Sequence, residues 1–357
     1  MDLDALYDRF DERDWETPAE GTLRVAMVGL GGWTRNHAIP AVAAGDYCET
    51  TVLVSGHADK AESVAAELPG EPETLDYEAF HAGAASEAYD AAYVATPNAL
   101  HLPHVRAAAD LGKHVLCEKP LEASAERARA LVDACEEAGV TLMTAYRLTA
   151  DPAVRFAREL VREGYVGEPG LVRGHMTQPV LDHGDADQWR LDPDLAGRGT
   201  SVTDLGIYPL STARFVLDAD PVRVSAAMSS EHSAFADVPD ERASFRLEFP
   251  DGLVADCAAS QNLQRSGSFR IVGTEGEIRF DPAFYGDPRR TLALQRGSTS
   301  TEFAFDAVDQ MRAEFDYFGN RVLAGREPEA DGAFGAADVA TIEAVYDAAK
   351  RDAPVEL

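Results

Sequence analysis

Two groups of polar side chains in this sequence have the types and spacing needed for proton chemistry. Lys119 stands in the run Cys117-Glu118-Lys119-Pro120 at the end of a short apolar strand, and it is one of four lysines among 357 residues. An ammonium at such a place can steer a proton or lower the pKa of a neighbour. Asp204 and Tyr208 lie four residues apart in a segment predicted to be helical, so they share a face and predict a polar site in a cleft. The alternatives are that Lys119 only ends a strand edge, and that Tyr208 is a core tyrosine beside an exposed aspartate.

A glycine turn, Gly29-Leu30-Gly31-Gly32-Trp33-Thr34, follows the first apolar strand. Its glycines let the backbone turn sharply and approach a pyrophosphate, which then lies at the N-terminus of the next helix. The sixth position is Thr34 instead of glycine, and we expect this to loosen the packing of helix on strand. The turn predicts a dinucleotide site, the alternative being a plain tight turn. The expected cofactor contacts here are Gly29, Leu30, Gly31, Gly32, Trp33 and Arg35.

The end of the second strand indicates which dinucleotide binds. NAD sites usually place an acidic residue there for the ribose 2′-hydroxyl, but the acid in this sequence, Asp59, comes too late. The segment therefore predicts NADP, with its 2′-phosphate among Ser55, Gly56, His57 and Lys60. The alternative for Lys60 is an ordinary surface lysine in the first turn of a helix.

Other polar residues follow the next strands, whose carboxyl ends form the ligand crevice in this architecture. Asn98 is expected to bond a ribose or carboxamide, or else to cap the next helix. His101 and His104 are three residues apart without a third ligand, so we expect no metal. The further expected cofactor contacts at these strand ends are Thr96, Pro97, Asn98, His101, Glu118 and Lys119.

The elements that position these residues change character midway along the chain. Short apolar runs alternate with helices up to residue 145, which predicts an α/β fold with a doubly wound parallel (Rossmann) sheet. The expected strands are 23–28, 50–55, 91–95, 114–117 and 140–145, with helices ending near 44 and spanning 60–68, 101–111 and 124–138. A serine, Ser124, is expected to cap the last of these helices.

After about residue 147, hairpins with proline and glycine turns predict a second α+β domain. Its large, mainly antiparallel sheet should have one open face, with helices over the other. We expect the Asp204 helix to be capped by Ser201 or Thr203, with Gly206 leaving room between Asp204 and Tyr208. The predicted strands are 172–178, 222–228, 243–249, 253–260, 268–272, 277–280, 291–295 and 301–305, with helices 152–164, 308–323 and 336–351. The predicted divisions are an acidic extension 1–21, a dinucleotide domain 22–146 and a substrate and oligomerisation domain 147–357, whose C-terminal helix packs back toward the first domain.

Composition restricts the partners. A formal charge of −30 argues against binding nucleic acid or an anionic membrane, and its even spread with few lysines resembles proteins of salt-loving archaea. At about 1 M salt the Debye length is roughly 3 Å, so self-repulsion is screened. The acidic N-terminus and the lack of a long apolar stretch predict a cytoplasmic protein without signal peptide or membrane span. The four cysteines are expected to be reduced and mostly buried.

Taken together, these motifs resemble the Gfo/Idh/MocA oxidoreductase family across residues 22–355. The segments that carry the resemblance are the glycine turn, Glu118-Lys119-Pro120, Ala145-Tyr146-Arg147, Asp187-Gln188-Trp189-Arg190-Leu191 and Asp204-Leu205-Gly206-Ile207-Tyr208. The middle of the chain is most similar to the glucose-fructose oxidoreductase branch. With the salt-type composition, this likeness implies a haloarchaeal, NADP-dependent aldose dehydrogenase that oxidises a sugar at C1, with D-xylose as the expected substrate.

The resemblance also implies the roles of individual residues. Lys119 and Tyr208 would be catalytic, Asp204 would hold the sugar, and Arg147, Trp189 and Arg190 would line the cofactor and substrate cleft. A phenol ordinarily titrates near pH ~10, so a tyrosine base needs a cation beside it, which the lysine would supply. Three other functions remain open: a dehydrogenase of glucose or another aldose or polyol, a redox-neutral or internal-transfer enzyme that keeps its nucleotide, and a non-catalytic NADP sensor. The expected assembly is a homo-oligomer, either a dimer or a tetramer.

Overall fold

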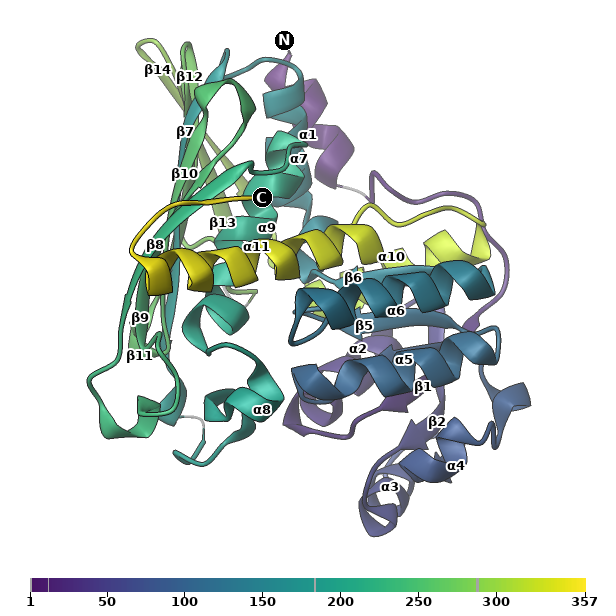
Figure 1. Ribbon diagram of the computed structural model, residues 1–357. Coiled ribbons are helices and arrows are strands. Elements are labelled where there is room, and N and C mark those ends of the chain that lie inside the picture. The colour runs from purple at the N-terminus through teal and green to yellow at the C-terminus, as the bar shows by residue number, and fades with distance from the viewer. Residues whose placement is uncertain (1, 12, 183, 287–288) are drawn as a thin grey trace. The chain divides into compact units, whose positions relative to one another are not determined.

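The computed structural model describes residues 2–11, 13–182, 184–286 and 289–357 (Figure 1). Met1 and Glu12 of the predicted acidic extension lie outside the described residues. The chain divides into two compact units. The Rossmann unit comprises Trp15–Arg147 and Asp309–Val339, and the second unit comprises Met1–Asp14, Leu148–Val308 and Ala340–Leu357. The prediction divided the chain between residues 146 and 147 and so assigned 309–339 to the second domain. In the structure, 309–339 belongs to the Rossmann unit.

The Rossmann unit contains six parallel strands in the order β3-β2-β1-β4-β5-β6, so the prediction of a doubly wound parallel sheet is confirmed. These strands are β1 (Leu23–Val28), β2 (Cys48–Val54), β3 (Glu73–Leu75), β4 (Ala91–Val94), β5 (His114–Glu118) and β6 (Leu142–Ala145). Strand order reverses between β1 and β4, the point where such sheets bind ligands. The strand β3 has three residues and was not predicted, because so short a segment shows no periodicity.

Helices cover both faces of this sheet (Figure 1). They are the π-helical turn Thr34–Ala38, α2 (Ile39–Ala44), α3 (Ala58–Ala65), α4 (Tyr77–His81), α5 (His101–Asp110), α6 (Ala125–Ala138) and α10 (Gln310–Leu323). The helices α5 and α6 pack together beside β4 and β5, whereas α10 packs on α2, β1 and β2. Phe315 and Phe318 of α10 are fully buried, and the Phe315 ring lies 5.0 Å from that of Tyr93. A helix from late in the chain therefore covers part of this sheet.

The second unit is built on a nine-stranded sheet in the order β14-β13-β12-β11-β7-β10-β9-β8-β15. Among the described strands of this sheet, only β7 and β10 pair in parallel. The predicted mainly antiparallel sheet is therefore confirmed. Along β9, Phe245 and Leu247 are buried while Ser244 and Arg246 are exposed, as expected for a sheet with one open face. The strands are β7 (Pro169–Pro179), β8 (Arg223–Ser229), β9 (Arg242–Glu248), β10 (Val254–Ser260), β11 (Asn262–Gly273), β12 (Gly276–Phe280), β13 (Arg290–Arg296), β14 (Thr299–Phe305) and β15 (Val355–Glu356).

The helices of the second unit include α7 and α9, which pack together and against the sheet. The set is α1 (Leu3–Asp11), α7 (Pro152–Arg162), α8 (Pro193–Ala196), the π-helical turn Val202–Gly206, α9 (Ile207–Leu217) and the end of α11 (Gly332–Arg351). Short 3-10 helices span Ser86–Ala88, Asn98–Leu100, Arg147–Ala150, Val180–Asp182, Trp189–Leu191, Ser233–Phe235 and Pro250–Gly252.

The first part of the acidic N-terminal extension forms the helix α1 and belongs to the second unit, whereas the extension from Trp15 onward belongs to the Rossmann unit. In α1, the Tyr7 ring stacks 5.0 Å from Phe303, and Arg9 Nη2 lies 3.0 Å from Glu159 Oε1. The segment therefore buries an aromatic side chain against the sheet, in addition to carrying charge.

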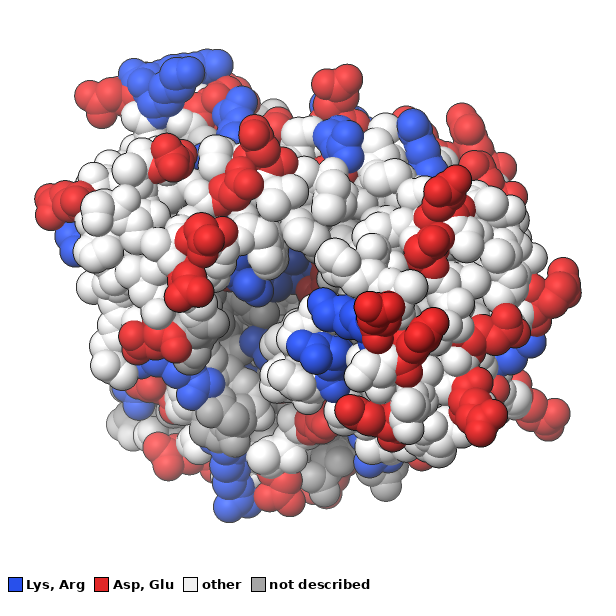
Figure 2. Space-filling model, turned by 90° about the horizontal axis from the view of Figure 1, so that it is seen from below, with Lys and Arg blue, Asp and Glu red and all other residues white. Residues whose placement is uncertain are grey.

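The surface view in Figure 2 shows acidic side chains scattered among uncharged residues on one face of the molecule. All four cysteines are buried and unpaired, as predicted. Within the described residues, no helix is long and apolar enough to cross a membrane.

Candidate active site

The glycine turn has the geometry that a pyrophosphate requires. Gly29 adopts a φ of +95°, and a Cβ there would lie 2.7 Å from the Ala95 carbonyl oxygen, so only glycine fits. A Cβ on Gly31 would meet nothing within 4 Å, and the backbone there is exposed. The fully buried Thr34 donates from Oγ1 to the Gly29 oxygen at 2.6 Å. The Thr34 hydroxyl therefore closes the turn on itself, and the expected effect of Thr34 on the packing of helix against strand stays a prediction.

A second contact links this turn to the strand that carries Lys119. Trp33 Nε1 donates to Glu118 Oε1 at 2.9 Å, and the Tyr93 hydroxyl donates to the same oxygen at 2.7 Å. The other oxygen, Oε2, accepts the backbone N–H of Lys119 at 3.1 Å. Burial and the Glu118 carboxylate raise the pKa of Tyr93 well above its usual range, which keeps it a donor. Glu118, predicted to touch the cofactor, thus joins the ends of β1, β4 and β5.

A buried carboxyl group, Glu314 of α10, lies close to this network. It is 1% exposed, and within the described part of the chain neither of its oxygens has a hydrogen-bond partner. Burial raises the pKa of Glu314 well above its usual range, the nearby Glu118 carboxylate adds to the effect, and the Arg147 guanidinium opposes it. The Arg147 guanidinium also stands 5.7 Å from the centre of the Trp33 ring. Burial and the nearby Glu118 together favour the neutral form of the Glu314 carboxyl group.

Glu314 should make folding stability depend on pH. Its pKa is higher in the native state than in the unfolded chain, so the contribution of Glu314 to stability is fully present below about pH 4.3 and is lost as pH rises through its native pKa. We expect Glu314→Gln to raise the free energy of unfolding at pH 8 by at least about 1 kcal/mol, since one pKa unit corresponds to about 1.4 kcal/mol. In thermal melts, the difference in stability between Glu314→Gln and the wild type should be smaller at pH 5 than at pH 8.

The control for this prediction is Glu137→Gln, which makes the same substitution at an exposed site on α6. If both variants give equal gains that do not change with pH, the proton on Glu314 has no part in stability.

The loop after β2 keeps part of the predicted 2′-phosphate site available. Ser55 is buried, and its Oγ accepts the backbone N–H of His57 at 3.2 Å. Gly56 and His57 are exposed, and Lys60 in the first turn of α3 is half-buried. The Ser55 hydroxyl is therefore engaged within the loop, and the two basic side chains remain the prominent candidates for a phosphate.

The loop after β4 places its polar residues differently from expectation. Thr96 and Asn98 are buried, and Pro97 between them is half-buried. The His101 ring is 0% exposed and lies between two backbone carbonyl oxygens. We expected it to contact the cofactor, but the ring is enclosed within the protein. The N-terminus of α5 is held by Glu122, whose Oε1 accepts the N–H of Leu102 at 3.2 Å.

In the second unit, Asp204 and Tyr208 lie on the π-helical turn and the start of α9. Asp204 Oδ2 accepts from Arg190 Nε at 3.2 Å and from Gln261 Nε2 at 2.7 Å. Tyr208 is 8% exposed, and its ring centre lies 6.2 Å from that of Phe284. The carboxylate is thus oriented by two side-chain donors, one of them charged.

Trp189 and Arg190, predicted to line the cleft, occupy a 3-10 helix, where the Arg190 guanidinium lies 4.6 Å from the Trp189 ring centre. Gln261 was not predicted. It follows β10 in a run of polar residues without any motif, so only the folded chain shows its contact with Asp204. A Cβ on Gly206 would come 3.1 Å from the Phe245 ring, so this glycine serves packing against β9.

The helix that carries Asp204 is anchored by two acidic residues at the start of β9. The Asp240 carboxylate accepts the N–H groups of Thr200 and Val202, each at 2.8 Å. Ser201 Oγ donates to the backbone carbonyl oxygen of Glu241 at 3.1 Å, and Thr203 Oγ1 lies 3.1 Å from the Tyr346 hydroxyl. The prediction that Ser201 or Thr203 caps the helix is therefore wrong, because Asp240 provides the acceptors from a distant segment.

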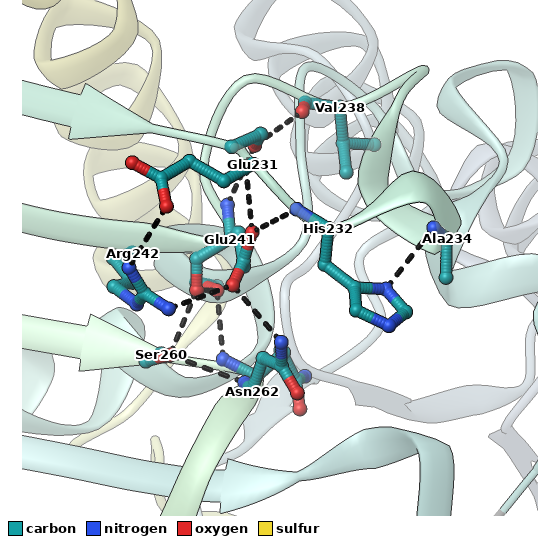
Figure 3. Close-up of polar contacts among 11 residues, drawn as sticks. Glu231, His232, Ala234, Val238, Glu241, Arg242, Ser260 and Asn262 are labelled. Carbon is teal, nitrogen blue, oxygen red and sulfur yellow. Dashed lines mark hydrogen bonds and ion pairs between the residues drawn. The ribbon is translucent and has the colours of Figure 1, made fainter.

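Glu241 stands at the centre of a polar cluster (Figure 3). Its carboxylate accepts the backbone N–H groups of Glu231 at 2.7 Å and His232 at 2.8 Å, and the Asn262 amide at 2.9 Å. The two backbone donors lower the pKa of Glu241 to about 2. The cluster fixes the loop before β9, and with it the strand ends around the Asp204 helix.

The predicted site residues therefore form two sets. The Rossmann unit holds the glycine turn, the loops after β2, β4 and β5, and Arg147, whereas the second unit holds Trp189, Arg190, Asp204 and Tyr208. Among the described residues, no group of three or more histidine, cysteine, aspartate or glutamate side chains is arranged to hold a metal ion.

Two family models match the chain in succession. Residues 23–146 match the oxidoreductase family with NAD-binding Rossmann fold, and residues 154–279 match the GFO/IDH/MocA C-terminal domain. The chain belongs to the Gfo/Idh/MocA oxidoreductase family. The resemblance predicted from the motifs is thereby confirmed.

Similar proteins are named as sugar oxidoreductases. The chain is 51% identical to D-xylose 1-dehydrogenase [NADP(+)] of Haloarcula marismortui, over 100% of both chains. It is 37% identical to D-xylose 1-dehydrogenase (NADP(+)) 2 of Haloferax volcanii, covering 93% of this chain and 98% of that one. Among solved structures, an aldose-aldose oxidoreductase from Caulobacter crescentus complexed with glycerol superposes with a TM-score of 0.87 at 32% identity, covering 94% of this chain and 100% of that one.

Proposed function

We propose that this protein oxidises a cyclic aldose, D-xylose first, at C1 to the lactone with NADP as hydride acceptor. The observation that carries the proposal is the 51% identity, over the full length of both chains, to a relative named for this activity. The site supports it, because Asp204 is an oriented acceptor next to a tyrosine on the same helix, as recognition of a sugar hydroxyl needs.

The residues of the chain have distinct tasks in this reaction. Tyr208 takes the proton of the C1 hydroxyl, and the Lys119 ammonium stabilises the phenolate and bonds the same hydroxyl. Asp204 accepts a hydrogen bond from a second sugar hydroxyl. When bound, NADP supplies the nicotinamide ring that accepts the hydride from C1.

Several groups of the Rossmann unit would hold the cofactor. The open backbone at Gly31 and the helix that follows receive the pyrophosphate, with Arg35 beside it. His57 and Lys60 take the 2′-phosphate, and the loop of Thr96 and Asn98 borders the nicotinamide side. Because the protein is strongly acidic, capture of this anion should benefit from salt screening.

A panel of aldoses with NADP in molar salt tests the proposal. We expect NADPH absorbance to rise with D-xylose and, more weakly, with hexoses, since one methylene-scale difference changes the activation free energy by only about 1–3 kcal/mol. If no aldose reduces NADP at any salt concentration, the proposed reaction is wrong.

A second candidate function is hydride exchange between two sugars through a nucleotide that stays bound. It is favoured by the 32% identity to the Caulobacter aldose-aldose oxidoreductase. In that case the nucleotide would co-purify with the protein, and a single aldose would give no accumulating NADPH. A non-catalytic NADP sensor would neither produce NADPH nor convert one sugar to another. Such a sensor would not need Tyr208 and Lys119.

Lys60→Ala should narrow the preference for NADP over NAD. We expect a loss of about 10-fold or more in that ratio, because a hydrogen bond to a charged group contributes about 1.5–3 kcal/mol. The ratio is measured as kcat/KM for each cofactor in high salt. The control is Lys113→Ala, whose ammonium lies 5.3 Å from the Tyr89 ring centre. A wild-type preference for NAD would overturn the assignment of this loop.

We further propose that the protein works in the cytoplasm of a salt-loving archaeon as a homo-oligomer, a dimer or a tetramer. The charge of −30 supports the salt requirement. The exposed face of β9 and its neighbouring strands supports self-association. The only other partner proposed is the sugar, with no nucleic acid and no membrane.

A further inference from the structure

The loop that carries Lys119 has no regular secondary structure of its own. It connects β5 to α6, and the loop that connects β4 to the start of α5 lies next to it, because β4 and β5 are paired in parallel. A lysine that must hold its ammonium at one place therefore depends on contacts between these two loops.

One side chain, His101, contacts the backbone of both loops. Its Nε2 lies 2.9 Å from the Thr96 carbonyl oxygen, and its Nδ1 lies 3.1 Å from the Leu121 carbonyl oxygen. The ring is completely buried at the first position of α5. Both partners can only accept, so a ring protonated on both nitrogens holds both loops, whereas a neutral ring holds one.

A second contact between the loops lies farther along the chain. Arg127 Nη2 donates to the Ala99 oxygen at 2.8 Å and to Glu122 Oε1 at 2.7 Å. This ion pair binds the far ends of the two loops, after Lys119. His101 thus supplies a contact between Thr96 and Leu121, the residue two positions after Lys119.

We infer that His101 is a positioning residue that sets the place of Lys119 relative to the Thr96 loop. The consequence for catalysis rests on the proposed function, but the geometric claim does not. Its ring contacts no reacting group and acts through the two carbonyl oxygens. Loss of the link lets the Lys119 loop shift while the glycine turn and the 2′-phosphate loop keep their structure.

Two conservative variants separate the two hydrogen bonds. In His101→Gln the amide nitrogen replaces Nε2 and keeps the bond to Thr96, and in His101→Asn it replaces Nδ1 and keeps the bond to Leu121. We expect His101→Gln to lower kcat by about 10-fold or more, since a misplacement near 1 Å can cost up to about 100-fold. His101→Asn should stay closer to wild type, and the Kd for NADP should change little in either.

A readout that needs no sugar accompanies these assays. Acetic anhydride labels exposed lysines, and mass spectrometry follows the rate at Lys119 against internal references in the same chain. These references are Lys60 and Lys350. We expect His101→Gln to change the Lys119 rate, with the reference rates unchanged. The control is His114→Gln at the opposite end of β5, where the ring accepts the Thr141 N–H at 3.1 Å, and it should alter neither kcat nor the Lys119 rate.

The outcomes are distinct. Wild-type kcat and Lys119 labelling in His101→Gln would overturn the inference, as would equal changes in His101→Gln and His114→Gln. Altered labelling in a protein that oxidises no aldose would reject the proposed function and keep the positioning role. If His101→Gln does not fold, His101→Leu, which removes both hydrogen bonds, supplies the same comparison, and an unchanged Lys119 labelling rate in it would overturn the inference.

Discussion

Replacing Tyr208 by phenylalanine is expected to remove nearly all aldose-dependent NADP reduction, with a fall in kcat of about 10²–10⁴-fold, the range typical for loss of a general base. The ring keeps its buried place at the start of α9, and only the phenolic oxygen is lost, which in the proposed reaction takes the proton in its deprotonated form. The Kd for NADP, measured by fluorescence titration, should stay near the wild-type value.

The matched control for this variant is Tyr165→Phe, which removes a hydroxyl from a tyrosine of the second unit that is 5% exposed. It should keep full turnover. Wild-type activity in Tyr208→Phe would show that the base has been assigned to the wrong residue.

Replacing Lys119 by alanine should lower kcat by a similar factor of about 10²–10⁴, because the phenolate loses the cation that stabilises it. NADP should still bind. The double variant Lys119→Ala/Tyr208→Phe should be hardly slower than either single variant, because residues that act as a unit are non-additive.

Lys119→Arg tests what the cation contributes. It keeps the charge but not the compact ammonium, so partial turnover is expected. If Lys119→Ala loses only NADP affinity while kcat is maintained, the lysine serves cofactor binding alone.

Much of the fold could be predicted from short-range pattern. The strand and glycine turn at 23–34, the apolar strand before Lys119 and the cap at Ser124 depend on neighbours in sequence, and Ser124 Oγ does accept the Arg127 N–H. Pattern could not assign α10 to a sheet, because an amphipathic helix shows that one face is buried without showing against what.

The parts of the site that were missed share a different cause. Gln261, Glu314 and Asp240 each act on residues far away in sequence, and a buried acid on a helix looks the same in sequence as a solvated one. His101 was predicted as a cofactor contact, whereas its orientation toward two backbone carbonyl oxygens follows only from how the loops after β4 and β5 meet.

The passage of the chain between its units limits how evolution can exchange them. The chain changes units after Asp14, Arg147, Val308 and Val339, the last time inside the unbroken helix α11. A recombination that replaced only 15–147 would bring in a new sheet but keep the old α10. The side chains Phe315 and Phe318 would then pack against a sheet to which they are not fitted. Sugar specificity and cofactor specificity should therefore be inherited together in this lineage, and change by substitution instead of by exchange of domains.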